Sequence, residues 1–442
     1  MKKIMILFLG VLLILEPGSS IYSASIPQSL KPLYSYLETT LDTNHKWVDS
    51  QWDGKINSGY LPNASLIIAN SNSANAGYLT PSHLSLVDAF VKKLKTLGCK
   101  SVQLDLQFPI FDEQFFTYAK NNKLMKRTDP GASDYLKFYK NVAKLIRNQG
   151  LVFTVESQVI FTQKTYSQLP VKGYYQYFNN QGELGLELYK FYRLEMLKTI
   201  VRELAPDYLT ICDEPDTEVW LTGIDLLKKK DNYANMVKYY INELKLIANK
   251  TKLGCGFGIW DENSDYWIDT WSKLPIQFLN IHLYALDNFS NKYEDNLIPK
   301  LIRSIEKIQL LGKSVVMGEC WLYKRMKNDT NDIEKLYSRD FFDSFIPLDI
   351  SYLKLVSKIA HWKNVEYVSP FWSCFFFSYL TFDEAKNLEP LDRIKLNNGK
   401  VVQNIKKGSF SPTGKAYQEM NLNPETLRSS LYDCTVSVFR HN

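Results

Sequence analysis

The chain has 442 residues, of which 45% are hydrophobic and 23% are charged, and its formal net charge is +6. This balance is ordinary for a globular protein with a large buried core and excludes a chain that is disordered throughout. Lysines are scattered among acidic residues, without a basic cluster interleaved with aromatic residues, so nucleic acid is not an expected partner.

The N-terminal segment has the order of charged and apolar residues that is typical of a cleavable export signal. Lys2 and Lys3 precede an apolar run over residues 4–15, and small residues follow as far as Ala24. We therefore expect residues 1–24 to be a signal peptide and the mature protein to be secreted, either extracellular or periplasmic. An uncleaved N-terminal anchor is the alternative. No later segment has roughly 18 uncharged apolar residues, so no membrane span is expected after signal cleavage.

From about residue 64 the sequence alternates short apolar, β-branched runs with longer amphipathic runs, a pattern typical of βα units around a parallel sheet. The eight expected strands are 65–70, 101–107, 151–157, 208–212, 254–259, 278–284, 314–319 and 365–371. The expected helices are 81–97, 133–149, 183–204, 233–248, 291–311, 343–362 and 413–420. Eight repeats favour an α/β fold of the (β/α)8 TIM barrel type over an open doubly wound sheet, because no glycine-rich phosphate turn follows the first strand.

The repeats predict a single domain. Residues 25–63 are expected to be an N-terminal extension that packs on the barrel, and residues 64–442 are expected to form the barrel with a C-terminal tail. Long connecting segments place long loops at the C-terminal face of the barrel. One of them carries Asn397, Asn398 and Gly399, a sequence typical of a tight β-hairpin turn.

Six cysteines occur without any paired Cys-x-x-Cys spacing, so a zinc site is not expected. Four of them end apolar, strand-like runs, where small buried thiols fit the interior of a barrel. We therefore expect free thiols for most of them, with a disulfide between Cys99 and Cys434 as the alternative. Neither a metal ion nor an organic cofactor is expected, and the sequence leaves the oligomeric state open.

Two glutamates stand where strands four and seven end. Active sites of this fold lie at the C-terminal ends of the strands, so polar residues that directly follow an apolar run are the candidates for chemistry. Glu214 follows the fourth strand in Cys-Asp-Glu-Pro, and Glu319 ends the seventh strand. Hydrolysis of a glycosidic bond with retention requires two carboxyl groups about 5–5.5 Å apart. Because strands four and seven face each other across the barrel mouth, these glutamates are the candidate catalytic pair.

With these strand ends, the chain resembles clan A, the 4/7 superfamily, of retaining glycoside hydrolases. In that clan an Asn-Glu-Pro-like motif follows strand four, a glutamate ends strand seven, strand six carries His-x-Tyr, and a tryptophan ends strand eight. Glu214, Glu319, His282, Tyr284 and Trp372 stand at the matching places. The resemblance implies that Glu214 is the general acid/base and Glu319 the nucleophile. It also implies that Tyr284 hydrogen-bonds the nucleophile and that Trp372 forms the floor of the sugar subsite. A satisfied core histidine is the alternative for His282.

The resemblance covers residues 64–421, and the chain departs from the clan pattern at two places. Asp213 stands where the clan has an asparagine that contacts the sugar 2-hydroxyl. An aspartate there can still accept a hydrogen bond, but it puts a like charge beside Glu214. The second strand, ending at 105–107, also lacks the arginine often found in the clan. These departures keep open a barrel that binds carbohydrate and has lost its activity.

Three further residues are candidate substrate contacts, as is an aromatic segment. Glu156 ends the third strand, Trp260 follows the fifth and Trp321 follows the seventh. Glu156 can instead pair with a neighbouring base, and Trp321 and Trp372 can instead cap the core. The segment 166–178 can stack against sugar rings or pack against a neighbouring loop. It contains Tyr174, Tyr175 and Tyr177.

The expected function is that of a secreted, retaining glycoside hydrolase. It cleaves β-linked glycosidic bonds of a poly- or oligosaccharide by double displacement, with the carbohydrate as its only expected partner. Two alternatives remain open. One is a catalytically lapsed carbohydrate-binding barrel, and the other is a structural, surface-associated barrel without a sugar ligand.

Overall fold

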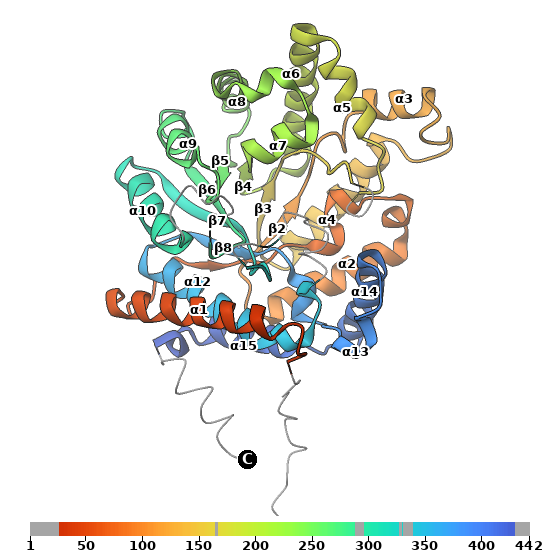
Figure 1. Cartoon of the computed structure of the whole chain (residues 1–442). Helices are drawn as coiled ribbons and strands as arrows, with labels where there is room; N and C mark the ends of the chain where they lie inside the picture. The colour runs from red at the N-terminus through yellow and green to blue at the C-terminus, as the bar shows by residue number, and fades with distance from the viewer. Residues whose placement is uncertain (1–25, 164–166, 288–295, 327–328, 330–338, 429–442) are drawn as a thin grey trace, which may run out of the picture.

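The computed structural model describes residues 26–163, 167–287, 296–326, 329 and 339–428. Eight parallel strands form one sheet in the order β1-β8-β7-β6-β5-β4-β3-β2, and helices surround it (Figure 1). The predicted (β/α)8 barrel is therefore confirmed. In the ranges given, no helix is long and apolar enough to cross a membrane. The expected signal peptide, residues 1–24, lies outside the described residues.

The strands are short and buried. They are β1 (Leu61–Pro62), β2 (Ser101–Asp105), β3 (Val152–Glu156), β4 (Tyr208–Thr210), β5 (Lys252–Gly258), β6 (Phe278–Leu283), β7 (Ser314–Cys320) and β8 (Tyr367–Pro370). Their outer faces pack against helices and their inner faces fill the barrel, so both faces lack contact with water. This two-sided burial explains why the strands appear in the sequence as continuous apolar runs.

The first strand is not where the sequence predicts it. The strand expected at 65–70 is wrong, because Ile67–Ala69 is a 3-10 turn and β1 lies at 61–62, inside the expected extension. Leu66 and Ala69 are buried and Ile67 and Ile68 are partly buried, but the chain leaves the sheet after Leu66. Before that bend, Leu66 N donates to Gln103 O at 2.7 Å. This contact between the segment after β1 and strand β2 closes the barrel.

One main helix follows each strand and covers the barrel. These helices are α2 (Pro81–Thr96), α4 (Ala132–Asn148), α6 (Gly182–Thr199), α8 (Lys230–Leu244), α9 (Ser264–Trp271), α10 (Leu297–Leu310), α12 (Ile346–Trp362) and α15 (Pro412–Leu422). Additional helices lie in the connections after β2, β3, β4 and β8: α3 (Glu113–Asn121), α5 (Lys172–Asn179), α7 (Pro215–Thr222), α13 (Phe382–Ala385) and α14 (Pro390–Lys407).

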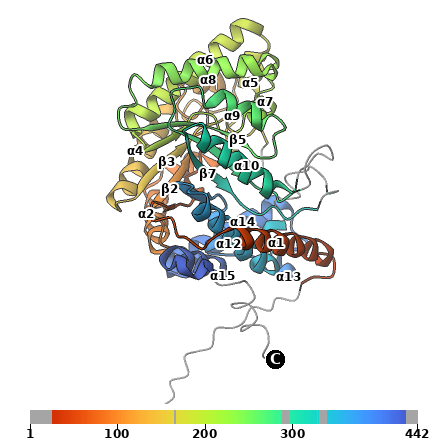
Figure 2. The ribbon, with the colours of Figure 1, turned by 90° about the vertical axis from the view of Figure 1, so that its left-hand side faces the viewer.

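A further helix, α1 (Lys31–Gln51), precedes the barrel and lies along α12 (Figures 1 and 2). Its apolar face is buried, and His45 Nε2 lies 3.0 Å from Ser351 O on α12. Asp49 forms an ion pair with the buried Lys358 of α12. The segment before the first strand is thus packed against the outside of the barrel.

The hairpin predicted around residues 397–399 is wrong, because α14 runs through it. Buried side chains recur at Asn397, Val401 and Ile405, a spacing of four residues that matches one face of a helix. A Cβ atom on Gly399 would meet nothing within 4 Å, so neither close packing nor a special backbone angle requires glycine there. The helical spacing of the apolar residues outweighs the local turn signal.

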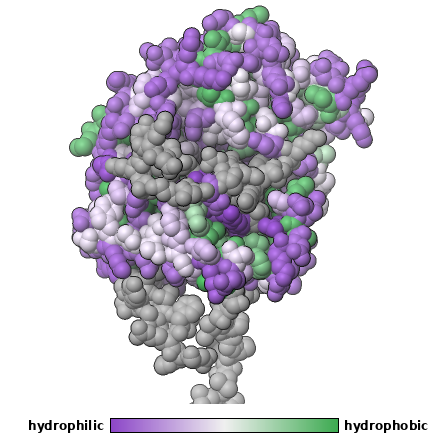
Figure 3. Space-filling view, in the orientation of Figure 1, coloured by the Kyte–Doolittle hydropathy of each residue, from purple (hydrophilic) through white to green (hydrophobic). Residues whose placement is uncertain are grey.

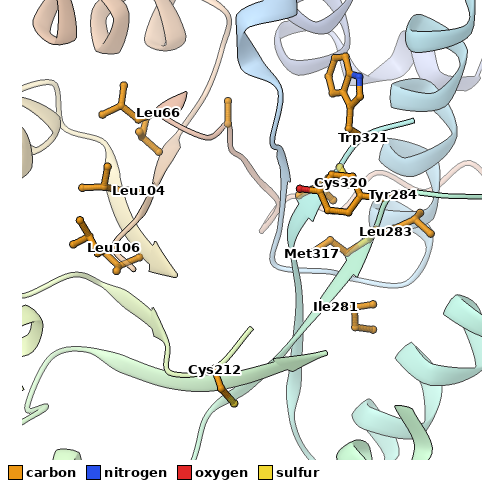
Figure 4. Packing of buried hydrophobic residues seen from close by; sticks show 14 of the residues in the cluster. Leu66, Leu104, Leu106, Cys212, Ile281, Leu283, Tyr284, Met317, Cys320 and Trp321 are labelled. Carbon is orange, nitrogen blue, oxygen red and sulfur yellow. The ribbon is translucent and has the colours of Figure 1, made fainter. Parts of the chain in front are cut away.

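The core contains the cysteines as buried, free thiols at all five positions that the structure describes, as expected. Cys434 lies outside the described residues. Figure 4 shows Cys212 and Cys320 in the core, together with Ile281 and Met317 of neighbouring strands β6 and β7. The outer surface is different in character: outside the grey atoms, the face in Figure 3 is mainly hydrophilic with scattered hydrophobic residues.

Candidate active site

The side chain of His282, on β6, lies between the two candidate catalytic carboxyl groups. Its Nδ1 atom is 2.8 Å from Glu214 Oε1 and 3.6 Å from Glu319 Oε2. The separation of these two oxygens therefore cannot exceed the sum of the two distances, a limit just below the roughly 6.5–9.5 Å of inverting glycosidases. The structure thus brings the carboxyl groups from strands four and seven against the same ring nitrogen of His282.

Glu214 is positioned by the end of β4 and the start of α7. Pro215 cannot continue a strand, and it fits the first position of a helix. Glu214 occupies the cap position of that helix, but its side chain makes no cap hydrogen bond. Its carboxyl group instead accepts a hydrogen bond from Thr217 Oγ1 at 2.6 Å and contacts His282. The carboxyl group of Glu214 therefore points toward His282 and does not cap the helix.

Glu319 projects from an irregular part of β7. The register with β6 shifts between Asn280 and His282, and such irregularities redirect side chains at barrel rims. Tyr284 donates a hydrogen bond to Glu319 Oε2 at 2.6 Å, as the resemblance implies. Burial raises the pKa of Glu319 well above its usual value, and the nearby Glu156 adds to this, whereas His282 opposes it. Tyr284 and His282 are thus the groups that favour the ionised form.

Glu156, on β3, lies beneath this pair and is fully buried. It accepts hydrogen bonds from Asn280 Nδ2 at 2.5 Å and from Gln103 Nε2 at 3.0 Å. Its Oε1 atom is also 3.5 Å from His282 Nε2. Burial alone would lower the pKa of His282, but Glu319 and Glu156 together raise it well above the usual value. A protonated imidazole therefore compensates the buried carboxylates.

Three ligand atoms of Glu156, His282 and Glu319 lie within 4.8 Å of one another, so this is the part of the site with a donor set for a metal ion. Each of these side chains already has a partner in the protein. Asn280 Nδ2 donates to Glu156, His282 Nδ1 contacts Glu214 Oε1, and Tyr284 donates to Glu319. These contacts favour a cluster that shares protons over one that holds a cation.

Two buried aspartates complete the acidic cluster. Asp213 is 1% exposed and its Oδ1 atom has no hydrogen-bond partner, while burial, followed by Glu156, raises its pKa well above the usual value. Asp105, at the end of β2, accepts a hydrogen bond from Asn70 at 2.6 Å. Burial, followed by Glu156, raises the pKa of Asp105 to about 8. Both carboxyl groups are therefore favoured in their neutral form.

Several residues of the cluster were not singled out from the sequence: Gln103, Asp105 and Asn280. The signal was available, since Gln103 and Asp105 are two residues apart on β2, as are Asn280 and His282 on β6. Residues at this spacing point to the same side of a strand. Polar residues at alternate positions of a buried strand therefore mark the strands that contribute to the site.

The three candidate tryptophans differ in their placement. Trp260 is partly buried, its ring centroid is 6.1 Å from that of Tyr284, and its Nε1 donates to Asp216 at 3.1 Å. Trp372 is also partly buried, after β8. Trp321, in contrast, is 1% exposed and stacks on Phe375 in the core. Trp260 and Trp372 thus keep some exposed surface, and Trp260 lies beside Tyr284 of the site, whereas Trp321 packs as a core residue.

The part of the aromatic segment that the structure describes, residues 167–178, also packs mostly inward, and residue 166 lies outside the described residues. Within it, α5 carries Tyr174 and Tyr175, both buried, and Tyr175 donates to Phe108 O and Ile160 O. Tyr177 is the exposed tyrosine of this helix. Tyr174 and Tyr175 therefore pack within the protein and are not available to stack against sugar rings.

No protein-family model matches the chain, and no curated protein matches it. Among solved structures, an exo-β-1,4-mannosidase from Opitutaceae bacterium strain TAV5 is 12% identical with a TM-score of 0.51, over 84% of this chain and 60% of that chain. A glycoside hydrolase family 5 mannosidase from Rhizomucor miehei is 11% identical with a TM-score of 0.46, over 85% and 98%. A β-glycosidase from Pyrococcus horikoshii is 14% identical with a TM-score of 0.46, over 83% and 95%. At 12% identity, the likeness to the mannosidase from Opitutaceae bacterium shows a shared fold.

Proposed function

We propose that the chain is a retaining glycoside hydrolase in which Glu319 is the nucleophile and Glu214 the general acid/base. The observation that carries the proposal is the pair of carboxyl groups from β4 and β7 held against one ring nitrogen of His282. The upper limit on the distance between the two contacting oxygens lies below the range of inverting glycosidases, which supports a double-displacement mechanism. The clan resemblance of the strand-end residues supports the same roles.

In the first step, a lone pair of Glu319 attacks the anomeric carbon while the bond to the leaving oxygen breaks. Glu214, in its protonated form, gives its proton to that oxygen, so the leaving group departs as an alcohol. In the second step, ionised Glu214 takes a proton from water, and the hydroxide displaces Glu319 from the sugar. Two inversions at one carbon give net retention.

Neighbouring side chains can stabilise the negative charge on Glu319 in the first step and on Glu214 in the second. The Tyr284 hydroxyl donates to the Glu319 carboxylate, so it holds the nucleophile in place and stabilises it when it leaves the sugar. His282 contacts both carboxyl groups, so it can compensate the charge that passes from one to the other. Trp260 and Trp372 offer partly exposed aromatic surface for sugar rings.

The expected substrate is a β-linked poly- or oligosaccharide outside the cell. Helices α3, α5 and α7 lie in the connections after β2, β3 and β4, and connections of this kind build the substrate site in the fold. The export signal expected over residues 1–24 would bring the protein to such a substrate. N-terminal sequencing of the mature protein tests this part, because an intact Met1 would contradict signal cleavage.

Hydrolysis of aryl β-glycosides tests the catalytic roles. Glu319→Ala is expected to abolish turnover, and azide is expected to restore it with inverted product, because azide fits the space of the carboxylate. Glu214→Ala is expected to keep turnover of substrates with a dinitrophenyl leaving group, which needs no proton. NMR of the first anomer released should show retention. Normal hydrolysis by Glu319→Ala, or inversion by the natural chain, would overturn the assignment.

A second candidate function is carbohydrate binding without turnover. The observation that favours it is Asp213, whose buried Oδ1 atom has no partner and which stands beside Glu214 in place of an asparagine. This candidate predicts retention of the chain on a polysaccharide affinity gel, with no release of reducing sugar from any of the polysaccharides that bind.

A further inference from the structure

A buried ion pair outside the carboxyl cluster lies directly behind Glu214. Arg193 of α6 is 1% exposed and Glu218 of α7 is fully buried, and their Nη2 and Oε2 atoms are 3.2 Å apart. Burying two charges is costly unless hydrogen bonds satisfy both groups. Here Tyr189 and Tyr233 donate their hydroxyl hydrogens to Glu218, the latter at 2.8 Å. The pair is therefore built into the core by several elements.

The guanidinium group of Arg193 also binds the backbone where two strands end. It donates to Gln158 O, to Ser157 O at 3.0 Å and to Ile211 O at 3.1 Å. Ser157 and Gln158 follow β3, and Ile211 follows β4. One planar side chain thus holds together the C-terminal ends of the strands that carry Glu156 and lead to Glu214. Helices α6, α7 and α8 gather around this point (Figure 1).

Two routes connect the ion pair to the backbone of Glu214. Glu218 N donates to Glu214 O at 3.0 Å, so the first turn of α7 joins the pair to the acid/base residue. Gln158 Nε2 donates to the same carbonyl oxygen at 2.7 Å, while the Gln158 carbonyl accepts from Arg193. Both hydrogen bonds to the Glu214 carbonyl therefore come from residues that Arg193 holds.

We propose that Arg193 and Glu218 are positioning residues for Glu214, which set the distance of its carboxyl group from His282 and from the leaving oxygen of the substrate. Neither side chain reaches the surface of the site, so neither contacts substrate. This inference rests on the proposed function of Glu214. Substitution of Arg193 or Glu218 should impair proton transfer by Glu214 and leave the attack by Glu319 unchanged.

A series of aryl β-glycosides with leaving groups of increasing pKa tests the proposal. Arg193→Lys keeps the charge but loses the planar group that bonds several carbonyls at once. Glu218→Gln keeps the size and loses the charge. Both variants are expected to lower kcat/KM, which reports the first step alone, by about 10- to 100-fold for phenyl leaving groups, since proton donation contributes about this much or more. The kcat/KM of the dinitrophenyl substrate should stay within about twofold.

Two further variants separate positioning from stability. Gln158→Met removes one link to the Glu214 carbonyl and leaves the ion pair intact, so it is expected to show the same dependence on the leaving group. Tyr233→Phe removes one hydrogen bond from Glu218 and is expected to lower the melting temperature without that dependence. Equal loss of activity for all leaving groups in Arg193→Lys, Glu218→Gln and Gln158→Met would overturn the proposal. Glu319→Ala tests the proposed function separately, because it should abolish turnover of every substrate in the series.

Discussion

The carboxyl group of Glu156 occupies the space beside Gly318 that any larger residue would need. A Cβ atom on Gly318 would lie 1.6 Å from Glu156 Oε1 and 2.6 Å from Asn280 Nδ2. Only glycine at position 318 leaves room for the Glu156 carboxyl group to reach His282. The residue directly before Glu319 is thus set by the packing of the cluster.

Gly318→Ala is accordingly expected to displace Glu156 and to disturb the hydrogen bonds of Asn280 and His282. Overpacking of a well-packed core typically costs about 1–3 kcal/mol of unfolding free energy. We also expect a loss of kcat of more than about tenfold, since the shift reaches a neighbour of both catalytic carboxyl groups. Urea unfolding and aryl glycoside kinetics check both effects. Gly399→Ala is the matched control, because a Cβ atom there meets nothing within 4 Å, and helix propensity predicts a slight gain in stability. Unchanged kinetics in Gly318→Ala would contradict the packing argument.

Tyr284→Phe removes the hydroxyl that donates to Glu319 at 2.6 Å and leaves the ring in place. Hydrogen bonds to a charged group contribute about 1.5–3 kcal/mol, so kcat/KM is expected to fall about 10- to 100-fold. Because the nucleophile acts on every substrate, the loss should appear with good and poor leaving groups alike. Tyr239→Phe, at an exposed tyrosine of α8, is the control and should leave kcat/KM unchanged. An unaltered kcat/KM in Tyr284→Phe would mean that this hydroxyl does not support the nucleophile.

Asp213→Asn is expected to stabilise the protein, and more so at high pH. Burial, followed by Glu156, raises the pKa of Asp213 in the folded protein well above its unfolded value. The folded state therefore binds the proton more tightly, and the free energy of unfolding falls as the pH rises above about 4. Asparagine removes this loss, which amounts to at most about 1.4 kcal/mol per pH unit.

Urea unfolding of Asp213→Asn and of the natural chain at pH 5 and pH 8 measures this difference. The gain in Asp213→Asn should be larger at pH 8. Asp383→Asn, whose side chain is 88% exposed, is the control and should show equal effects at both pH values. An advantage of Asp213→Asn that is the same at both pH values would show that Asp213 does not titrate as its burial requires.

On the acid side, His45 and His361 are expected to limit stability. Burial, as the largest cause, lowers the pKa of each to about 4. The unfolded chain binds these protons near pH 6.5, so the stabilisation is complete above that pH and is lost as the pH falls toward 4. The loss is roughly 3 kcal/mol at most for each histidine. In the double variant His45→Gln, His361→Gln, the decrease in unfolding free energy between pH 7 and pH 4.5 should be smaller than in the natural chain. Parallel pH curves would rule the two histidines out as the cause.

The fold could be predicted because strands that are buried on both faces appear in the sequence as continuous apolar runs. Seven of the eight expected strands overlap strands of the structure, and one main helix follows each strand. The error at 65–70 arose because an apolar run does not distinguish a strand from a 3-10 turn that packs on the core, and Ile67 and Ile68 are partly buried there. The error at 397–399 arose because a turn signal of three residues was preferred over the helical spacing of Val401 and Ile405.

The candidate site was accessible from the sequence only in part. Glu214, Glu319 and His282 stand at strand ends, and the order of the strands brings strand ends together. Glu156 also ends a strand, but its strand position does not reveal its burial or its partner Asn280. Asp105 was missed, since its partner Asn70 comes from a distant segment. The role of Arg193 cannot be derived from spacing at all. Its helix is amphipathic in the ordinary way, and only the fold shows that its side chain points at two strand ends.

The seam of the barrel, where β2 meets the segment after β1, includes one residue of the acidic cluster, Gln103. Gln103 bonds Ala64 and Leu66 through its backbone, which joins β2 to the segment after β1, and bonds Glu156 and Asp105 through its side chain. A local opening of this seam would withdraw the amide that holds Glu156 before any helix unwinds. Activity would then disappear at a lower urea concentration than the helical signal. The protection of the Leu66 amide against hydrogen exchange would report the same opening. Local opening between β2 and the segment after β1, and not global unfolding, would then limit the conditions under which the protein is active.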